Sequence, residues 1–161
     1  MIRKLFVILI LSLFTTNSFS AGSDSTSSKV KSNYDKAVES IKFAKKYEAK
    51  GKIEKAKKRY AKAQKLLLKS NKEKPLQADT LNYLGFTTRK LGDYENGEKY
   101  YLLGLEINPS HVGINEYLGE LYVATNRISL AKERLKVLES CNCEEYTELK
   151  EIIDGTKQSK Y

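Results

Sequence analysis

The sequence repeats itself, and this repetition restricts the folds that the chain can adopt. A Leu-Gly pair at residues 84–85 recurs 34 residues later at residues 118–119. The turn signal Gly92-Asp93-Tyr94 is followed at the same spacing by Asn126-Arg127-Ile128. A period of roughly 20–50 residues is typical of arrays in which similar small units stack on one another. We therefore expect a repeat architecture and not one compact core.

Each unit has the sequence pattern of a helical hairpin. From about residue 32 onward, apolar residues return every three or four positions, as they do along a helix with one buried face. Proline occurs only at Pro75 and Pro109, where one helix should stop and another begin. No segment alternates polar and apolar residues over a length that would suit a strand. The sequence predicts an all-α fold.

Equivalent positions of the units carry equivalent residue types. The predicted tight turns carry residues that tolerate a left-handed backbone, namely Gly51, Gly92 and Asn126. The first helix of each hairpin carries a small residue where we expect a neighbouring helix to approach closely, namely Ala44, Gly85 and Gly119. The first unit is seven residues longer than the period, which predicts about two additional helical turns before Pro75.

These residues resemble the tetratricopeptide repeat (TPR) family, in the form of a small exported bacterial protein. The resemblance is strongest over residues 78–111 and rests on Leu84, Gly85, Gly92, Asp93, Tyr94, Gly97, Tyr101, Gly104 and Pro109. It implies a right-handed α-solenoid with repeats at about 37–70, 78–111 and 112–145. An apolar face on residues 144–157 predicts a C-terminal capping helix, with Asn142 as its N-cap. The TPR-like domain is expected at 33–157, followed by a tail at 158–161.

The first twenty residues have the layout of a secretory signal peptide. A basic start at Arg3-Lys4 precedes an apolar run from Leu5 to Phe14 and a small-x-small site at 18–20. The run is too short to span a bilayer, so we expect cleavage after Ser20 and not a retained anchor. Residues 21–32 are small and polar and are expected to form a flexible leader. The prediction is export, to the periplasm in a Gram-negative host and otherwise to the outside of the cell.

The positive charge is concentrated in the first unit. The whole chain has a formal net charge of +9. Residues 29–75 hold 17 Lys and Arg against 5 Asp and Glu, whereas residues 76–161 hold 10 against 14. The predicted basic patch consists of Lys55, Lys57, Lys58, Arg59, Lys62, Lys65 and Lys69. It is interpreted either as a solvated helix face or as a site for an acidic protein or an anionic envelope surface. Export makes nucleic acid a poor candidate for the partner.

Two cysteines and no others stand close together at Cys141 and Cys143. In an oxidising compartment such a pair is expected to form a disulfide, and a turn at Asn142 would bring the two residues within reach. A redox-active pair, a soft-metal site and free thiols are the alternatives that the sequence leaves open. No third His, Met or Cys lies nearby in the sequence to complete a metal site.

No constellation of catalytic residues stands out. The only histidine, His111, follows a turn, and carboxylate pairs such as Glu116 and Glu120 are expected on helix surfaces. We therefore expect neither enzymatic activity nor a cofactor. The resemblance to TPR proteins implies instead that the first helices line a concave groove for a protein or peptide partner. The residues predicted to line it are Ile41, Lys45, Glu48, Asn82, Phe86, Arg89, Lys90, Glu116, Glu120 and Val123.

Overall fold

A computed structural model describes residues 30–159 of the chain, and these residues form seven helices. The signal peptide predicted at residues 1–20 and most of the predicted leader lie outside the described residues. The helices are α1 (Asn33–Glu48), α2 (Ile53–Glu73), α3 (Ala78–Lys90), α4 (Tyr94–Ile107), α5 (Val112–Ala124), α6 (Ile128–Leu138) and α7 (Glu144–Ile153). The prediction of an all-α fold is confirmed.

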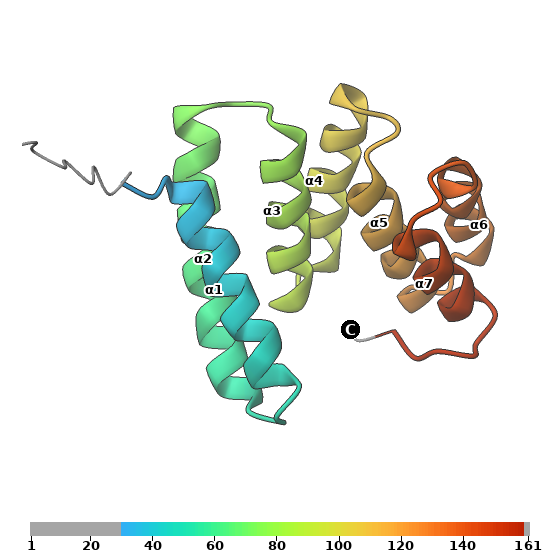
Figure 1. The fold of residues 1–161 in the computed structure, drawn as a ribbon, viewed down its shortest axis with the longest axis horizontal. Coiled ribbons are helices and arrows are strands. Elements are labelled where there is room, and N and C mark those ends of the chain that lie inside the picture. Colours follow the sequence, from blue (N-terminus) through green and yellow to red (C-terminus); the bar gives the residue numbers. More distant parts are fainter. Residues whose placement is uncertain (1–29, 160–161) are drawn as a thin grey trace, which may run out of the picture.

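Six of these helices pair into three hairpins that stack side by side (Figure 1). The hairpins are α1–α2, α3–α4 and α5–α6, and α7 packs against both helices of the last one. The odd-numbered helices contact one another in succession, from α1 to α3, α5 and α7. This is the predicted solenoid of three helix-turn-helix units with a terminal helix over the last apolar face. Within residues 30–159, no helix is long and apolar enough to cross a membrane.

The three predicted tight turns have the expected backbone. Gly51, Gly92 and Asn126 have φ angles of 66°, 97° and 58°, which lie in the left-handed region. Each residue stands at the same place in its hairpin, just before the second helix. Glycine adopts this conformation without a steric penalty and asparagine tolerates it, so the turn residues reverse the chain at low cost.

Local signals also explain where the first hairpin begins and why it is long. Ser32 forms a capping box with Asp35 at the start of α1, so that two otherwise unsatisfied backbone N–H groups are bonded. Helix α2 has 21 residues against 14 in α4, the predicted excess of seven residues. The extension ends at Glu73, and Pro75 follows two residues later, where a proline prevents the helix from continuing.

The core lies between the helices of each hairpin, and small residues allow the close contacts. Tyr60, Tyr101, Leu84 and Leu118 are buried. A methyl group placed on Gly85 of α3 would lie 2.5 Å from the Tyr101 ring of α4. These two helices can therefore pack at their observed separation only because residue 85 has no side chain.

Helix α7 is joined to the last hairpin through a short cysteine-containing bend. Cys141 and Cys143 form a disulfide with their Cα atoms 5.1 Å apart. Asn142 between them has a φ of 49°. The prediction that Asn142 caps α7 is wrong, because the N-cap is Cys143 and no side chain bonds to the first turn. The left-handed backbone that closes the bend at Asn142 places this residue outside the helix.

Glycine at position 85 provides a direct test of the packing. We expect Gly85→Ala to lower the free energy of unfolding by about 1–3 kcal/mol, because the rigid Tyr101 ring cannot yield without moving α4. Urea denaturation measures the change. Thr147→Ala in α7, where the side chain is exposed, serves as the control and should change the stability little. Equal stability of Gly85→Ala and the wild type would contradict the close packing of α3 on α4.

Candidate functional site

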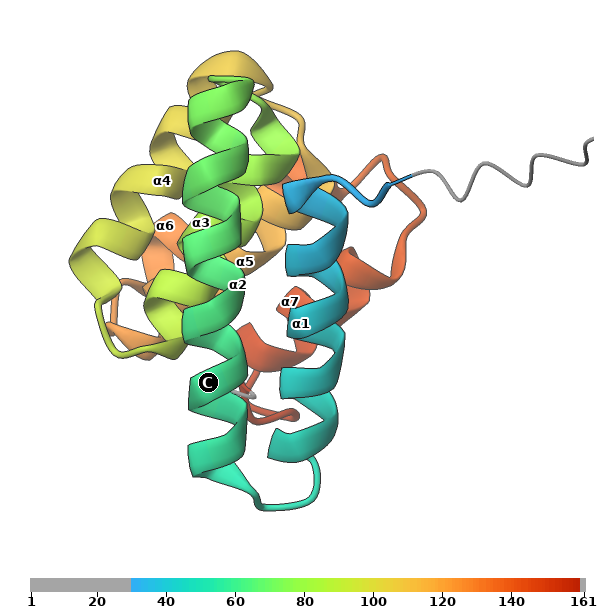
Figure 2. The same cartoon turned by 90° about the vertical axis from the view of Figure 1, so that its left-hand side faces the viewer.

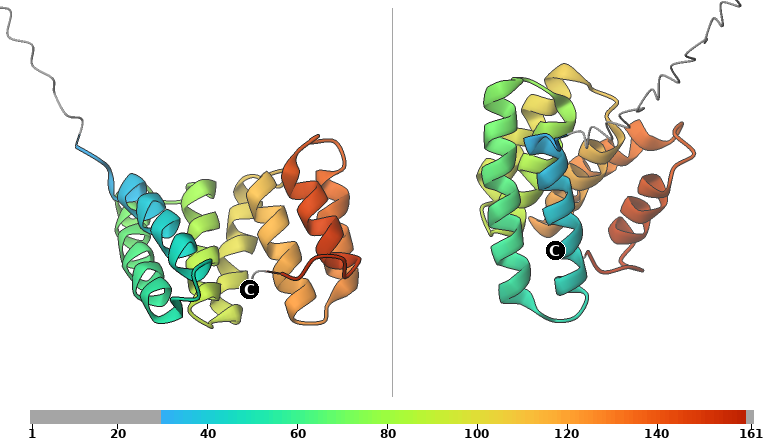
Figure 3. Two further views of the ribbon diagram at one scale, coloured as in Figure 1. Left: turned by 60° about the horizontal axis from the view of Figure 1, so that its bottom comes forward. Right: turned by 60° about the vertical axis from the view of Figure 1, so that its left-hand side comes forward.

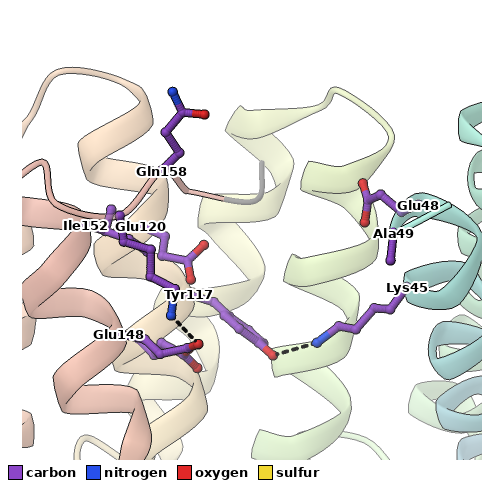
Figure 4. A pocket seen from close by; sticks show the side chains of 10 residues that line it. Lys45, Glu48, Ala49, Tyr117, Glu120, Glu148, Ile152 and Gln158 are labelled. Carbon is purple, nitrogen blue, oxygen red and sulfur yellow. Dashed lines mark hydrogen bonds and ion pairs between the residues drawn. The ribbon is translucent and has the colours of Figure 1, made fainter. Parts of the chain in front are cut away.

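The inner side of the array carries a cavity of about 370 Å³. Figure 2 shows α1 and α7 on one side of the molecule and α4 on the other, and the segment after α7 turns back toward the middle of the array (Figure 3). The cavity is lined by residues of α1, α5, α7 and this last segment: Lys45, Glu48, Ala49, Glu116, Tyr117, Glu120, Glu148, Ile152, Lys157 and Gln158. Figure 4 shows these side chains around the space between α1 and α7.

The α1 wall is connected to α5 through the aromatic ring of Tyr117. The Lys45 ammonium group donates a hydrogen bond of 3.3 Å to the Tyr117 hydroxyl (Figure 4). The same ammonium nitrogen lies 4.9 Å from the centre of the Phe86 ring and 5.6 Å from that of Tyr117. The two rings themselves lie 5.0 Å apart. A cation over aromatic faces is stabilised by their quadrupoles, so Lys45 is positioned across the groove.

A second contact ties the end of α1 to α3. Glu48 accepts a 2.6 Å hydrogen bond from the Lys90 ammonium and a 2.9 Å bond from the Tyr60 hydroxyl. The Lys90 side chain is only 4% exposed. Burial lowers the pKa of Lys90, and the bond to Glu48 acts in the opposite direction. Glu48 therefore both lines the cavity and holds the first two hairpins together.

Beneath the cavity lies a buried ion pair between α3 and α5. Arg89 Nη2 stands 3.2 Å from Glu120 Oε2, and the two side chains are 0% and 4% exposed. Arg89 also donates a 2.9 Å hydrogen bond from Nη1 to the backbone carbonyl of Tyr117. Burial raises the pKa of Glu120, whereas Arg89 favours its charged form. One guanidinium group thus fixes the helix that carries three of the cavity-lining residues.

The opposite wall of the cavity is acidic. Glu116 of α5 is 5% exposed, and it lines the cavity together with Glu148 of α7. Burial, followed by the nearby carboxylates Glu120, Glu148 and Glu145, raises the pKa of Glu116 to about 9. Glu148 also accepts a 2.6 Å bond from Lys157 (Figure 4). At neutral pH Glu116 is therefore a protonated, neutral side chain that can donate a hydrogen bond.

Four of the ten residues predicted for the groove line the cavity: Lys45, Glu48, Glu116 and Glu120. The structure places Ile41, Asn82, Phe86 and Arg89 beneath the surface, where each is at most 6% exposed. Lys90 forms a salt bridge with Glu48, and Val123 is half-buried against the core of the last hairpin. The buried residues therefore support the groove and do not present contact surface to a partner.

Sequence reasoning missed the residues that close the cavity on the side of α7. Glu148, Ile152, Lys157 and Gln158 line it on that side, and none of them belongs to a predicted first helix. Tyr117 of α5 and Ala49 at the end of α1 are further lining residues that were not predicted. The repeat register assigns α7 to capping alone. Glu148 and Ile152 are four residues apart and lie on one side of α7, but this spacing is equally typical of a helix that only caps the array.

The predicted basic patch divides into two parts. Lys55, Lys58, Arg59 and Lys62 gather around Tyr47 on the outer side of the first hairpin, and Lys65 and Lys69 continue along α2. Lys57 lies apart from them, beside Ile53 and the turn before α4, with its ammonium group 3.8 Å from Glu54. The patch is therefore one row of cations with Lys57 excluded.

The remaining candidate residues have structural contacts. Both sulfur atoms are held in the Cys141–Cys143 disulfide, and residues 30–159 contain no group of three His, Cys, Asp or Glu that could hold a metal ion. His111 is the N-cap of α5, where its Nδ1 accepts a hydrogen bond from the Ile114 backbone N–H. Its Nε2 lies 3.0 Å from Asp79. The histidine that follows the turn therefore caps a helix.

Comparison with known proteins identifies the architecture. The translocator chaperone SycD of type III secretion in Yersinia enterocolitica has a similar fold, with a TM-score of 0.53, 14% identity, and coverage of 73% of this chain and 81% of that one. The fold is a TPR-like helical repeat. The first TPR of Spaghetti (RPAP3), bound to the HSP90 peptide SRMEEVD, is 22% identical with a TM-score of 0.49, and the match covers 79% of this chain and 98% of that one. The first TPR domain of human RPAP3 is 21% identical with a TM-score of 0.49, over 78% of this chain and 94% of that one.

No protein-family model matches the chain, and no curated protein matches it. The identities to these three solved structures are below 25%, so the likeness concerns the fold. The function of this TPR-like protein has to be argued from its own groove.

The buried carboxyl of Glu116 predicts a specific pH dependence. The unfolded group has an ordinary pKa of 4.5 and the folded group one of about 9. Between these values the folded state keeps a proton that the unfolded state has released, so the free energy of unfolding should fall as the pH rises. Between about pH 6 and pH 8.5, we expect the free energy of unfolding of Glu116→Gln to decrease less than that of the wild type. At the upper end of this range the variant should be more stable than the wild type.

Urea denaturation at several pH values measures this slope. Glu106→Gln removes an exposed carboxylate of α4 and is the matched control, with an expected slope like that of the wild type. Parallel curves for Glu116→Gln and the wild type would show that Glu116 is ionised in the folded protein.

Proposed function

We propose that the protein is a non-catalytic scaffold that binds an extended peptide segment of a partner protein in its concave groove. The observation that carries the proposal is the cavity between α1, α5 and α7. It combines an aromatic ring, an aliphatic side chain and charged groups, in Tyr117, Ile152, Lys45 and Lys157. Sites that bind peptides pair apolar contact surface with a few polar groups that set the orientation.

The groove is prepared for binding because its supporting residues are already fixed. Phe86 packs between Tyr60 and Tyr117, with ring centres 5.7 and 5.0 Å away. Arg89 and Lys90 tie α3 to α5 and to α1. A surface that is ordered before binding loses little conformational entropy when the partner arrives, which favours affinity. SycD, the protein with the similar fold, is a chaperone of translocator proteins, so such an array serves a protein partner there.

We place the site of action outside the cytoplasm. The signal-peptide pattern at residues 1–20 supports export, to the periplasm of a Gram-negative host or out of the cell otherwise. The N-terminal sequence of the mature protein tests this, since cleavage after Ser20 leaves Ala21 first. The alternative function, thiol redox or soft-metal handling by Cys141 and Cys143, predicts thiols that react under native conditions. An unreactive disulfide in thiol titration would exclude it.

Photo-crosslinking from the groove tests the proposed function, because it captures whichever protein occupies the cavity. A photoreactive phenylalanine derivative is placed at Ala49 or Gln158, which line the cavity from opposite sides. The control position is Leu102, an exposed residue of α4. We expect both cavity positions to form an adduct with the same protein in cells, because one peptide spans the groove, and Leu102 to form none.

The peptide-binding role is further tested by Lys45→Glu. This variant reverses the charge that faces Tyr117 and should reduce the adduct at Gln158. The absence of adducts at both cavity positions, or equal labelling from Leu102, would contradict a partner in the groove.

A further inference from the structure

Five lysines of α2 form a straight row on the outside of the first hairpin. Lys55, Lys58, Lys62, Lys65 and Lys69 are separated by three or four residues, which places their side chains on one side of the helix. All five are exposed. The opposite side of α2 carries the residues that are buried against the rest of the protein: Ala56, Tyr60, Ala63, Leu67 and Ser70. The row therefore faces away from the core along about four turns of helix.

The row continues onto α1 through an exposed aromatic ring. Phe43 is 41% exposed. The Arg59 guanidinium lies 5.3 Å from the centre of this ring, and the Lys46 ammonium lies 5.8 Å from it. We call the surface made by the five lysines together with Arg59, Lys46 and Phe43 the basic face. It combines a positive charge with one large apolar side chain that the fold leaves in solvent.

Little negative charge offsets the basic face. Among residues 30–159, Glu39 of α1 lies within electrostatic reach of Arg59 and Lys62, and it is bound to Lys31 at 2.7 Å. Glu54 of α2 lies near Lys57, whose side chain lies outside the basic face. Over the described part of the chain, none of the five lysines forms a salt bridge with a carboxylate. The face therefore projects a net positive field, which Glu39 offsets only in part.

We propose that the basic face docks the protein on the surface of a bilayer that contains anionic lipids. Lysine is a compact, hydrated point charge, and a row of lysines suits diffuse attraction to many headgroups. Clusters of four to eight basic residues on a helix are typical of anionic-lipid recognition. The exposed Phe43 ring adds the apolar side chain that an interfacial surface inserts among the headgroups.

The residue types favour lipid over an acidic protein or nucleic acid. Arginine pairs with carboxylates in a bidentate manner and is enriched at protein interfaces, where lysine is depleted. The basic face has six lysines, and its one arginine, Arg59, lies over the Phe43 ring. Tyr47, which lies among the cations, is half-buried and packs against the core of the first hairpin, so its ring serves the fold and is not displayed for the stacking of nucleic-acid bases.

The proposed docking surface leaves the groove open. Phe43 and Lys45 are two residues apart on α1 and point to different sides, one into the basic face and the other into the cavity. In Figure 2 the first hairpin faces the viewer and α7 lies behind it. A protein held to a bilayer through the outer side of α2 would still present its groove to a partner in solution.

Vesicle co-sedimentation with the full chain tests the proposal. The probes are vesicles of phosphatidylcholine alone and vesicles with one quarter phosphatidylglycerol. We expect binding to the anionic vesicles that weakens from about 50 to 500 mM salt, because the Debye length shortens. Lys58→Gln, Lys62→Gln and Lys65→Gln together should reduce the partition at least about tenfold, since one lysine near an anionic surface contributes on the order of fivefold.

The matched control removes the same charge elsewhere. Lys99→Gln, Lys132→Gln and Lys136→Gln together alter exposed lysines of α4 and α6 and should retain the binding. Phe43→Ser should weaken binding to the anionic vesicles, and the binding that remains should keep its dependence on salt. The proposal would be overturned if the two triple variants lost binding equally or if both vesicle types bound the protein equally. Binding to heparin or DNA without binding to anionic vesicles would also overturn it. Thermal unfolding of every variant confirms that it is folded.

Discussion

The arrangement of the groove depends on one buried ion pair, between Arg89 of α3 and Glu120 of α5. Among the described residues, Arg89 is the largest with a fully buried side chain. Its guanidinium contacts both the Glu120 carboxylate and the Tyr117 carbonyl. A charge buried at this depth is costly unless its partner stays in place. The second and third hairpins are therefore held at one separation, and α7, which packs on α5, takes its position from the same contact.

The polar contacts around the groove form one system that extends from α1 to α7. Lys45 and Tyr117 cross the groove, Glu48 and Lys90 join its first two hairpins, and Arg89 lies beneath it. On the α7 side, Glu116 is held neutral by burial and by neighbouring carboxylates, with a pKa of about 9. Buried ionisable groups with strongly shifted pKa values lower the stability of a protein, and they are found most often at functional sites. Glu116, a buried carboxyl with a raised pKa beside the cavity, is a group of this kind.

The sequence was sufficient to predict the features that recur with the repeat and the one departure from its period. The turn residues Gly51, Gly92 and Asn126 and the close approach at Gly85 follow from local rules of backbone and packing, and the extended α2 follows from the seven additional residues of the first unit. The lining of the groove was predicted only in part. Which face of a helix is open to solvent depends on the angle between successive hairpins, and the 34-residue period does not encode that angle. Phe86 and Arg89 were therefore assigned to the surface although they are buried, and the contribution of α7 was missed.

The distance between α1 and α7 tests the central role of the ion pair most directly. Spin labels at the exposed positions Lys42 and Lys150 report this distance by double electron–electron resonance. The wild type is expected to give one narrow distribution, and Glu120→Gln should broaden it, because the buried Arg89 charge loses its partner. Glu95→Gln, which removes the exposed partner of Lys99, should leave the distribution unchanged. An identical distribution in Glu120→Gln and the wild type would contradict the claim that Arg89 and Glu120 set the geometry of the groove.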